Sequence, residues 1–260
     1  MLRVTFRFYQ ELNDFLPPER RKVSFSVEAP KNCTVKSLIE DLGVPHTEVD
    51  LILVNGASVG FSHRPGEGDV ISVYPVFETL DISSVTRLRP EPLRVPRFVC
   101  DVHLGKLAGF LRLLGFDTVY RNNLEDEALL AVSRAESRIL LTRDRGLLKR
   151  RELTHGSFVR GTRPKDQLAE VVTRFSLQSR VRPFSLCMTC NVPLRRVDRA
   201  DVLQRIPPLV AKLYGEYAEC PSCGRVFWKG THWDRLKKLA DEVLGGGVLE
   251  KRSAGPGGPA

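Results

Sequence analysis

The chain has 260 residues, an apolar fraction of 42% and a formal net charge of +9. This length allows one large domain or two to three small ones, and the apolar fraction is high enough for real cores, which excludes a disordered chain. No apolar run reaches the ~18 residues of a transmembrane helix and the N-terminal residues lack a signal-peptide core, so we expect a cytoplasmic protein with no membrane association.

The charge is unevenly distributed along the chain. Residues 1–80 carry 8 basic and 11 acidic side chains, whereas residues 81–240 carry 30 basic and 17 acidic ones. The net charge of +13 on the second region favours a polyanionic partner such as RNA or DNA. The plainer alternative is an arginine-rich surface that serves solubility alone.

The first 80 residues alternate apolar and polar positions as half-buried strands do. The pattern predicts strands at 3–9, 22–27, 51–56 and 70–77, with one helix at 35–43 between the second and the third. Thr34 is expected to cap the start of the helix and Gly43 to end it. The predicted order is therefore β-β-α-β-β.

This order resembles a ubiquitin-like β-grasp domain, and is closest in pattern to the small sulfur-carrier proteins. Those carriers need an exposed C-terminal Gly-Gly for thiocarboxylate chemistry. Here the last strand continues into Glu78, Thr79 and Leu80 without a Gly-Gly. We therefore expect a module for packing or for binding a protein partner, without carrier chemistry.

After a proline- and arginine-containing linker, strands and helices are predicted to alternate. The expected strands are 97–100, 116–120, 139–142 and 157–160, and the expected helices are 103–114, 126–135 and 164–175, with a short basic helix or turn at 147–151. Such alternation is typical of an α/β domain with a parallel sheet.

Acidic residues follow two of these strands. Asp101 comes directly after the first, Asp144 follows the third, and Asp126 begins the helix between them. Ligands of open α/β sheets gather at the carboxyl ends of the strands, where carboxylates can bind a divalent cation. Each residue alone is more often a helix cap or a turn residue, so on the residues alone the two interpretations are about even.

Two CxxC pairs give the most specific local pattern in the chain. Cys187 and Cys190 form the first pair and Cys220 and Cys223 form the second, with 29 residues between the pairs. Each pair can present two thiolates to one tetrahedral zinc ion. A redox site would need only one pair, so a structural zinc is favoured. The lone residues Cys33 and Cys100 are expected to be small buried apolar residues.

Four segments of the chain together resemble the Mut-seven C-terminal RNase domain, which is PIN-like in fold and contains a zinc ribbon. The resemblance rests on DVHLGKLAGFLRLLGFDTVYR, LEDEALLAVSRAESRILLTRD, CMTC and CPSCGRVFWKGTHW, which occur in the family's order within 97–235. It implies a three-layer α/β fold and a magnesium or manganese site at Asp101, Asp126 and Asp144. It also implies a fourth acid, for which Glu125, Asp117 and Asp166 compete. The first 80 residues resemble the ubiquitin-like domain that precedes this domain.

The combined hypothesis is a metal-dependent ribonuclease in RNA processing or decay. The predicted parts are a β-grasp domain (1–80), a linker (81–96), a PIN-like nuclease domain (97–181), a zinc ribbon with a basic helix (182–240) and a disordered tail (241–260). The expected RNA-contacting residues are Lys106, Arg112, Arg143, Arg145 and Lys149, although several of them fit an ordinary solvated helix face. The alternatives are a non-catalytic RNA- or ribosome-binding protein and a toxin-like nuclease restrained by its own β-grasp domain.

Overall fold

The structure is a computed structural model that describes residues 1–75, 85–88 and 96–244. It divides into two compact units, one formed by Met1–Val95 with Glu125–Phe158 and the other by Pro96–Leu124 with Val159–Ala260. Most of the predicted linker 81–96 and of the predicted tail 241–260 lies outside the described residues, as do Glu78, Thr79 and Leu80.

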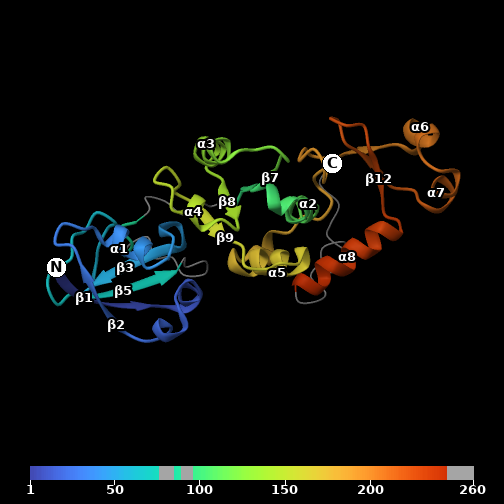
Figure 1. Cartoon of the computed structure of the whole chain (residues 1–260). Coiled ribbons are helices and arrows are strands. Elements are labelled where there is room, and N and C mark those ends of the chain that lie inside the picture. The colour runs from blue at the N-terminus through green and yellow to red at the C-terminus, as the bar shows by residue number, and fades with distance from the viewer. Residues whose placement is uncertain (76–84, 89–95, 245–260) are drawn as a thin grey trace. The chain divides into compact units, whose positions relative to one another are not determined.

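The first unit contains the predicted β-grasp domain (Figure 1). Its strands are β1 (Leu2–Phe8), β2 (Phe25–Ala29), β3 (Val49–Val54), β4 (Ala57–Ser58) and β5 (Val70–Pro75), in the sheet order β2-β1-β5-β3-β4. The pairing of β1 with β5 is parallel and the other pairings are antiparallel. The four predicted strands and the helix occur in the predicted order, and the two-residue β4 is an additional strand. Strand β2 begins later than residue 22, where Lys22 adopts φ 58°, which an extended strand excludes.

The β-grasp helix, α1 (Val35–Asp41), begins where the sequence predicts and ends two residues before the predicted residue 43. The Thr34 side chain accepts from the Ser37 N–H while the Ser37 hydroxyl accepts from the Thr34 N–H, which completes a capping box. Gly43 ends the helix at φ 95°, a conformation that L-residues other than glycine seldom adopt. Local chemistry therefore decides both ends of this helix.

Two short 3-10 helices, η1 (Gln10–Phe15) and η2 (Pro18–Arg20), join β1 to β2 where a turn is predicted. A third, η3 (His46–Glu48), leads into β3. Apolar side chains from the sheet, from η1 and from α1 form one core in which Phe6 and Phe8 stack with ring centroids 5.6 Å apart. Burying each such side chain contributes roughly 1.5–3 kcal/mol, so this domain has a substantial core of its own.

The first unit also contains half of the predicted nuclease domain. Its elements are α3 (Asp126–Glu136), β8 (Ile139–Thr142), α4 (Arg145–Leu148) and β9 (Gly156–Phe158). Strands β8 and β9 pair in parallel, with Leu140 opposite Gly156. A side chain at Gly156 would come within 2.7 Å of Leu148 Cδ2 and 2.9 Å of Leu153 Cδ2, so a larger residue there would displace both leucine side chains.

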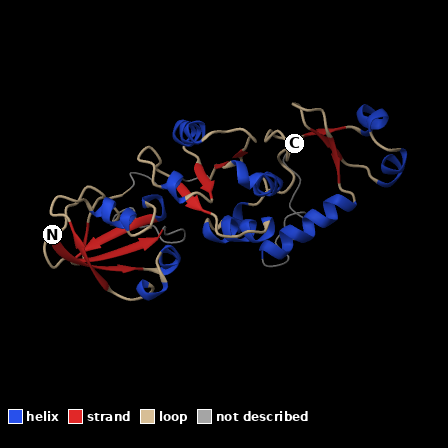
Figure 2. Ribbon diagram, viewed as in Figure 1, coloured by secondary structure: helices blue, strands red, loops and turns tan. Residues whose placement is uncertain are grey.

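The second unit holds the remaining strands and helices of that domain. They are β6 (Phe98–Cys100), η4 (Val102–Leu104), α2 (Gly105–Leu113), β7 (Thr118–Val119), α5 (Pro164–Arg174) and η5 (Leu177–Arg180). Strands β6 and β7 pair in parallel, as the alternation of strands and helices predicts. Helix α5 lies beside α8 (Thr231–Leu244), as Figures 1 and 2 show, and α8 continues past the predicted boundary at residue 240.

The ribbon region is a small antiparallel sheet with two short helices. Strands β10 (Arg195–Val197), β11 (Tyr217–Glu219) and β12 (Val226–Trp228) pair in sequence order, and α6 (Arg199–Val202), η6 (Leu203–Arg205) and α7 (Pro208–Leu213) connect the first two. Its buried cluster consists of Val202, Ile206, Ala211 and Tyr217. A core of this size is too small to hold a fold by apolar burial alone.

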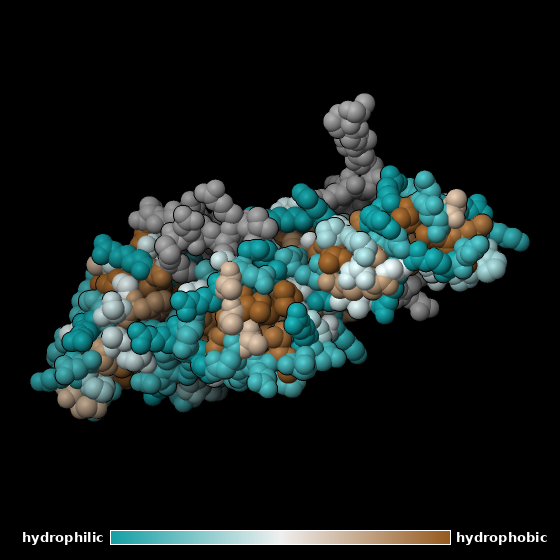
Figure 3. All heavy atoms as spheres, turned by 90° about the horizontal axis from the view of Figure 1, so that it is seen from above, coloured by the Kyte–Doolittle hydropathy of each residue, from teal (hydrophilic) through white to brown (hydrophobic). Residues whose placement is uncertain are grey.

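The surface mixes polar and apolar residues. On the face drawn in Figure 3, apolar patches lie among hydrophilic side chains. Among the large apolar residues of the protein, Leu209 and Leu213 are 65% and 64% exposed. Within the described residues, no helix has both the length and the apolar character that crossing a membrane requires.

Candidate metal centre and acidic site

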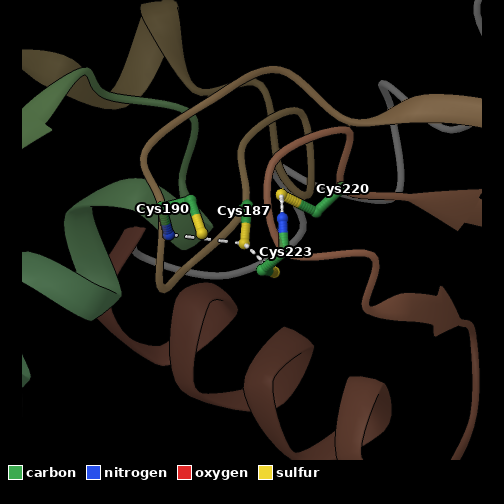
Figure 4. A group of neighbouring side chains, drawn as sticks. All are labelled: Cys187, Cys190, Cys220 and Cys223. Atoms are coloured by element: carbon green, nitrogen blue, oxygen red, sulfur yellow. Dashed lines mark hydrogen bonds between the residues drawn. The ribbon is translucent and has the colours of Figure 1, made fainter.

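The four cysteines of the CxxC pairs come together on two loops of matching geometry (Figure 4). In each loop the N–H of the second cysteine donates to the sulfur of the first, at 3.4 Å for Cys190 to Cys187 and 3.5 Å for Cys223 to Cys220. The residue after each pair, Asn191 or Gly224, has a positive φ and donates its N–H to the carbonyl of the first cysteine at 2.9 Å. The chain thus builds the same knuckle twice.

The sulfur positions fit a tetrahedral metal ion. All four sulfur atoms lie within 4.8 Å of one another, and those of Cys187 and Cys223 are 3.9 Å apart. A zinc ion with Zn–S bonds of about 2.3 Å places its sulfurs about 3.8 Å apart, whereas a disulfide holds them at about 2.0 Å. All six cysteines of the chain are free thiols. The group is therefore suited to a metal ion.

The thiols differ in how easily they lose their protons. A hydrogen bond with the Arg225 backbone lowers the pKa of Cys223 to about 7, and a hydrogen bond with Cys223 raises the pKa of Cys190 to about 11. Burial raises the pKa of Cys187. Because thiolates are the ligands, metal binding has to displace these protons, so the affinity is expected to fall as the pH falls.

The first knuckle is fastened to the α/β part of its unit through Arg112. Arg112 lies on α2 and is 5% exposed, and its Nε donates to the main-chain carbonyl oxygen of Thr118 at 2.8 Å. Its Nη1 donates to the Met188 and Thr189 oxygens at 2.9 and 2.8 Å. Arg112 was expected to contact RNA, but a buried guanidinium that binds three carbonyls is not available to a phosphate, so it is excluded from the proposed RNA surface.

Asn191 makes a second attachment at the same knuckle. Its Oδ1 accepts from the Thr118 N–H at 2.9 Å, and its Nδ2 donates to Asp117 Oδ1 at 2.5 Å. Sequence reasoning missed both Arg112 and Asn191 as structural residues of the ribbon. The available signal for Asn191 was its place directly after CMTC, where asparagine tolerates the left-handed conformation better than most residues.

We expect Arg112→Met to destabilise the second unit by about 2–4 kcal/mol, because buried carbonyls lose their donor. Chemical denaturation of the purified full chain measures this change. Lys106→Met is the matched control, since Lys106 lies exposed on the same helix and its loss is expected to cost less than about 0.5 kcal/mol. Equal denaturation midpoints for the two variants would contradict the assigned role.

The first acidic residue, Asp101, follows β6 and caps η4. Its Oδ1 accepts from the Val102 N–H at 2.5 Å, and the residue is 7% exposed. The capping alternative that the sequence left open is therefore present in the structure. Capping does not exclude metal binding, because a carboxylate has two oxygens that can each accept more than one contact.

Asp144 and Asp126 belong to the other unit. Asp144 Oδ1 accepts from the N–H groups of Gly146 and Leu147 at 2.6 and 3.3 Å, which caps α4. Asp126 is the exposed first residue of α3, next to the cap residue Glu125, whose side chain makes no capping bond. Each acid thus lies at the start of a helix, and their joint cation site with Asp101 stays a prediction.

The three candidates for a fourth acid have different surroundings. Asp117 accepts from Asn191 in the knuckle contact, and Asp166 forms an ion pair with Arg163 Nε at 2.7 Å on the first turn of α5. Glu125 is exposed. Asp166 does not cap α5, because the cap residue is Arg163 and no side chain makes a capping bond there. The choice of a fourth acid stays a prediction.

The remaining basic candidates are at or near the surface. Lys106, Arg143 and Arg145 are exposed, and Lys149 is partly buried. The guanidinium carbon of Arg145 lies 5.2 Å from the ring centre of Phe15 and 5.3 Å from that of Phe158. Lys149 Nζ donates to the main-chain carbonyl oxygen of Glu40 at 2.5 Å. Arg145 and Lys149 therefore each have a contact within the protein.

Comparison with known proteins gives two family matches. The Mut7-C RNAse domain matches residues 96–240, and the Mut7-C ubiquitin domain matches residues 1–81. No curated protein matches the chain. Among solved structures, the putative molybdopterin converting factor, subunit 1, from Pyrococcus furiosus is similar, with 20% identity and a TM-score of 0.24 over 29% of this chain and 98% of that one.

Proposed function

We propose, because this chain belongs to the Mut7-C RNAse domain family, that it is a divalent-metal-dependent ribonuclease acting in RNA processing or decay. The observation that carries the proposal is the family match over residues 96–240. The net charge of +13 on residues 81–240 supports RNA as the partner. The proposed location is the cytoplasm, a reducing compartment in which cysteines that bind a metal stay reduced.

The proposed catalytic residues are Asp101, Asp126 and Asp144. Three carboxylates can share one point only with a cation between them, because like charges repel one another. A bound magnesium or manganese ion supplies a Lewis acid for the phosphate and an activated water. Asp101 and Asp144 support this assignment because each follows a strand of the α/β domain and keeps its carboxylate at a fixed place through a backbone N–H.

The proposed reaction is hydrolysis of one phosphodiester bond. A water oxygen forms a bond to phosphorus, the ester oxygen on the opposite side leaves, and the proton of the water passes to solvent while the leaving oxygen gains one. The exposed residues Lys106 and Arg143 are suited to holding the RNA phosphates, which positions the scissile bond without reading the base sequence.

We propose that the metal at the four cysteines is zinc and that its role is structural. Four thiolates complete a tetrahedral shell and leave no position open for water or substrate, as in other closed zinc sites. The ribbon would then hold its basic residues near the RNA, while hydrolysis depends on the carboxylates.

A non-catalytic RNA-binding protein is the second candidate. The observation that favours it is that Asp101 and Asp144 both cap helices, which is sufficient reason for an acid at each position. Incubation of the purified full chain with RNA separates the two. Cleavage with manganese or magnesium that stops with a chelator supports the ribonuclease, and binding without cleavage under any divalent metal supports the alternative.

RNA affinity is expected to fall with salt, with a log–log slope of about −0.7 for each phosphate that the protein neutralises on a single strand. Lys106→Gln should reduce the slope by about 0.7, because one contact is lost. The matched control is Lys31→Gln, an exposed lysine in the region that carries more acidic than basic side chains. A binding constant that does not change between low and physiological salt would contradict a surface that follows the RNA backbone.

A further inference from the structure

The turn η3 joins the β-grasp domain to the segment that begins at Asp144. Its three side chains, His46, Thr47 and Glu48, are 6%, 1% and 0% exposed. Each contacts a backbone atom of that segment: His46 Nε2 lies 2.9 Å from the Leu153 oxygen, the Thr47 hydroxyl donates to the Leu148 oxygen at 3.4 Å, and Glu48 Oε1 accepts from the Phe158 N–H at 2.6 Å. Three consecutive residues thus hold three separate points between the end of α4 and the end of β9.

Apolar and cationic contacts continue the same interface. The rings of Phe15 and Phe158 meet edge to face with centroids 5.7 Å apart, and Phe158 packs against the β-grasp core. Arg145, the residue after Asp144, lies over both rings. Aromatic and cation–π contacts stabilise an interface by more than the burial of apolar area alone. The segment from Asp144 to Phe158 is therefore bound to the β-grasp domain along its length.

Helix α4 is the element through which this interface reaches Asp144. With only the four residues Arg145–Leu148, it is far too short to be stable by itself, so its position depends on what holds its two ends. Asp144 binds its first N–H groups, and Thr47 donates to the carbonyl of Leu148, one of the last carbonyls that lack a partner within a helix. A side chain at Gly146 would lie 3.1 Å from Asp144 Oδ1, so the cap is also closely packed.

We propose that Thr47 and Glu48 are positioning residues for Asp144, and that the β-grasp domain is a fixed part of the nuclease site. The inference rests on the proposed function, because Asp144 is a metal ligand only there. The turn η3 holds the α4–β9 segment, the segment holds α4, and α4 sets the direction of the Asp144 carboxylate. A buried turn of this kind cannot at the same time recruit a partner protein.

The experiment compares Glu48→Leu with Glu48→Gln in the full chain. Leucine removes the acceptor for the Phe158 N–H, whereas glutamine keeps an oxygen in its place. We expect Glu48→Leu to lower kcat for RNA by about tenfold and to weaken manganese binding by a similar factor, since small misplacements of a reacting group are costly. The KM for RNA should change by less than about twofold, because no proposed RNA contact is altered. Glu48→Gln should stay within about threefold of the wild type.

Three outcomes of the kinetic and metal-binding measurements overturn the inference. A folded Glu48→Leu variant with unchanged kcat and manganese affinity shows that the turn does not position Asp144. An equal loss in Glu48→Gln shows that the accepted hydrogen bond is not the cause. A rise in kcat shows that the β-grasp domain restrains the nuclease instead of completing it.

A readout independent of cleavage separates this inference from the proposed function. The N–H groups of Gly146 and Leu147 bind Asp144, so their hydrogen exchange reports on the cap directly. We expect about tenfold faster exchange in Glu48→Leu, and also in Thr47→Val, which keeps the side-chain shape if the first variant fails to fold. Unchanged exchange overturns the inference. A wild type that never cleaves RNA refutes the proposed function, yet leaves this measurement valid.

Discussion

Replacing Asp101 or Asp144 with asparagine is expected to reduce metal-dependent RNA cleavage by about two to three orders of magnitude. A catalytic cation contributes several kcal/mol of charge stabilisation, and about 1.4 kcal/mol corresponds to a factor of ten in rate. Asparagine removes one negative ligand at nearly constant size, so cleavage should fall while RNA binding persists or tightens. Single-turnover cleavage with manganese or magnesium measures the effect.

The folded structure should survive both substitutions. Asparagine caps helices about as well as aspartate, because its side-chain oxygen still accepts from the same N–H groups. The bond from Val102 to residue 101 and those from Gly146 and Leu147 to residue 144 are therefore retained. A loss of cleavage with an unchanged unfolding transition would then reflect the lost charge and not a lost cap.

Asp69→Asn provides the matched control. Asp69 lies in a β-grasp loop, where its carboxylate accepts from the Gly66 N–H at 2.7 Å and from Asn55 Nδ2 at 2.8 Å. The same chemical change at that place should leave cleavage unaltered. If Asp101→Asn and Asp144→Asn behave like this control, the nuclease activity comes from other residues or from a contaminant.

Local chemistry explains which parts of the fold could be predicted from the sequence. Helix α1 begins after Thr34 because a capping box forms there, and both halves of that box lie within four residues of sequence. Strand β8 spans Ile139–Thr142, as the short apolar run predicts. The four cysteines converge because each CxxC pair folds into a knuckle by itself. In all three cases the interacting residues are neighbours in the chain.

The contacts that could not be predicted join residues far apart in sequence. The sequence pattern predicts that Arg112 is an exposed cation of an amphipathic helix, but two of its three carbonyl partners lie 76 and 77 residues further along the chain. The contacts of the turn η3 span 101 to 110 residues. Periodicity and capping rules describe short windows, so neither the burial of Arg112 nor the attachment of the β-grasp domain to the Asp144 segment has a local signature.

Asp101 and Asp144 illustrate why a metal site is harder to predict from sequence than a helix cap. The sequence allows both a capping role and a metal-binding role for Asp101 and Asp144, and the structure confirms the capping role at each. Capping requires only an oxygen near two or three N–H groups, whereas cation binding requires several carboxylates at one point. The second requirement depends on tertiary packing, so the substitutions above are its direct test.

Removing the metal from the four cysteines is expected to unfold the ribbon, residues 182–235, while the β-grasp domain stays folded. The ribbon has a buried cluster of only Val202, Ile206, Ala211 and Tyr217, whereas structural zinc contributes about 10–16 kcal/mol of apparent binding free energy in small zinc domains. Cys190→Ser should have the same effect as chelation, because it removes one of four thiolates. Metal analysis of the purified chain should find one zinc per wild-type chain and none in this variant.

Tryptophan fluorescence can follow this unfolding selectively. The chain has two tryptophans, Trp228 in β12, packed against the ribbon cluster, and Trp233 in α8, stacked on Phe184. Both should move to a more exposed, red-shifted environment when the metal leaves. Acidification should produce the same change, because thiolates that bind the metal become protonated as the pH falls.

Cys33→Ser is the matched control for the cysteine substitution. Cys33 lies half-buried beside the β-grasp core and outside both knuckles, so its loss should leave the zinc content and the fluorescence unchanged. Full folding of the C-terminal region with reduced thiols and no bound metal would refute a structural metal. After metal removal, we expect the first knuckle to stay partly folded. Arg112 and Asn191 bind it to the α/β part of the same unit through contacts that need no metal.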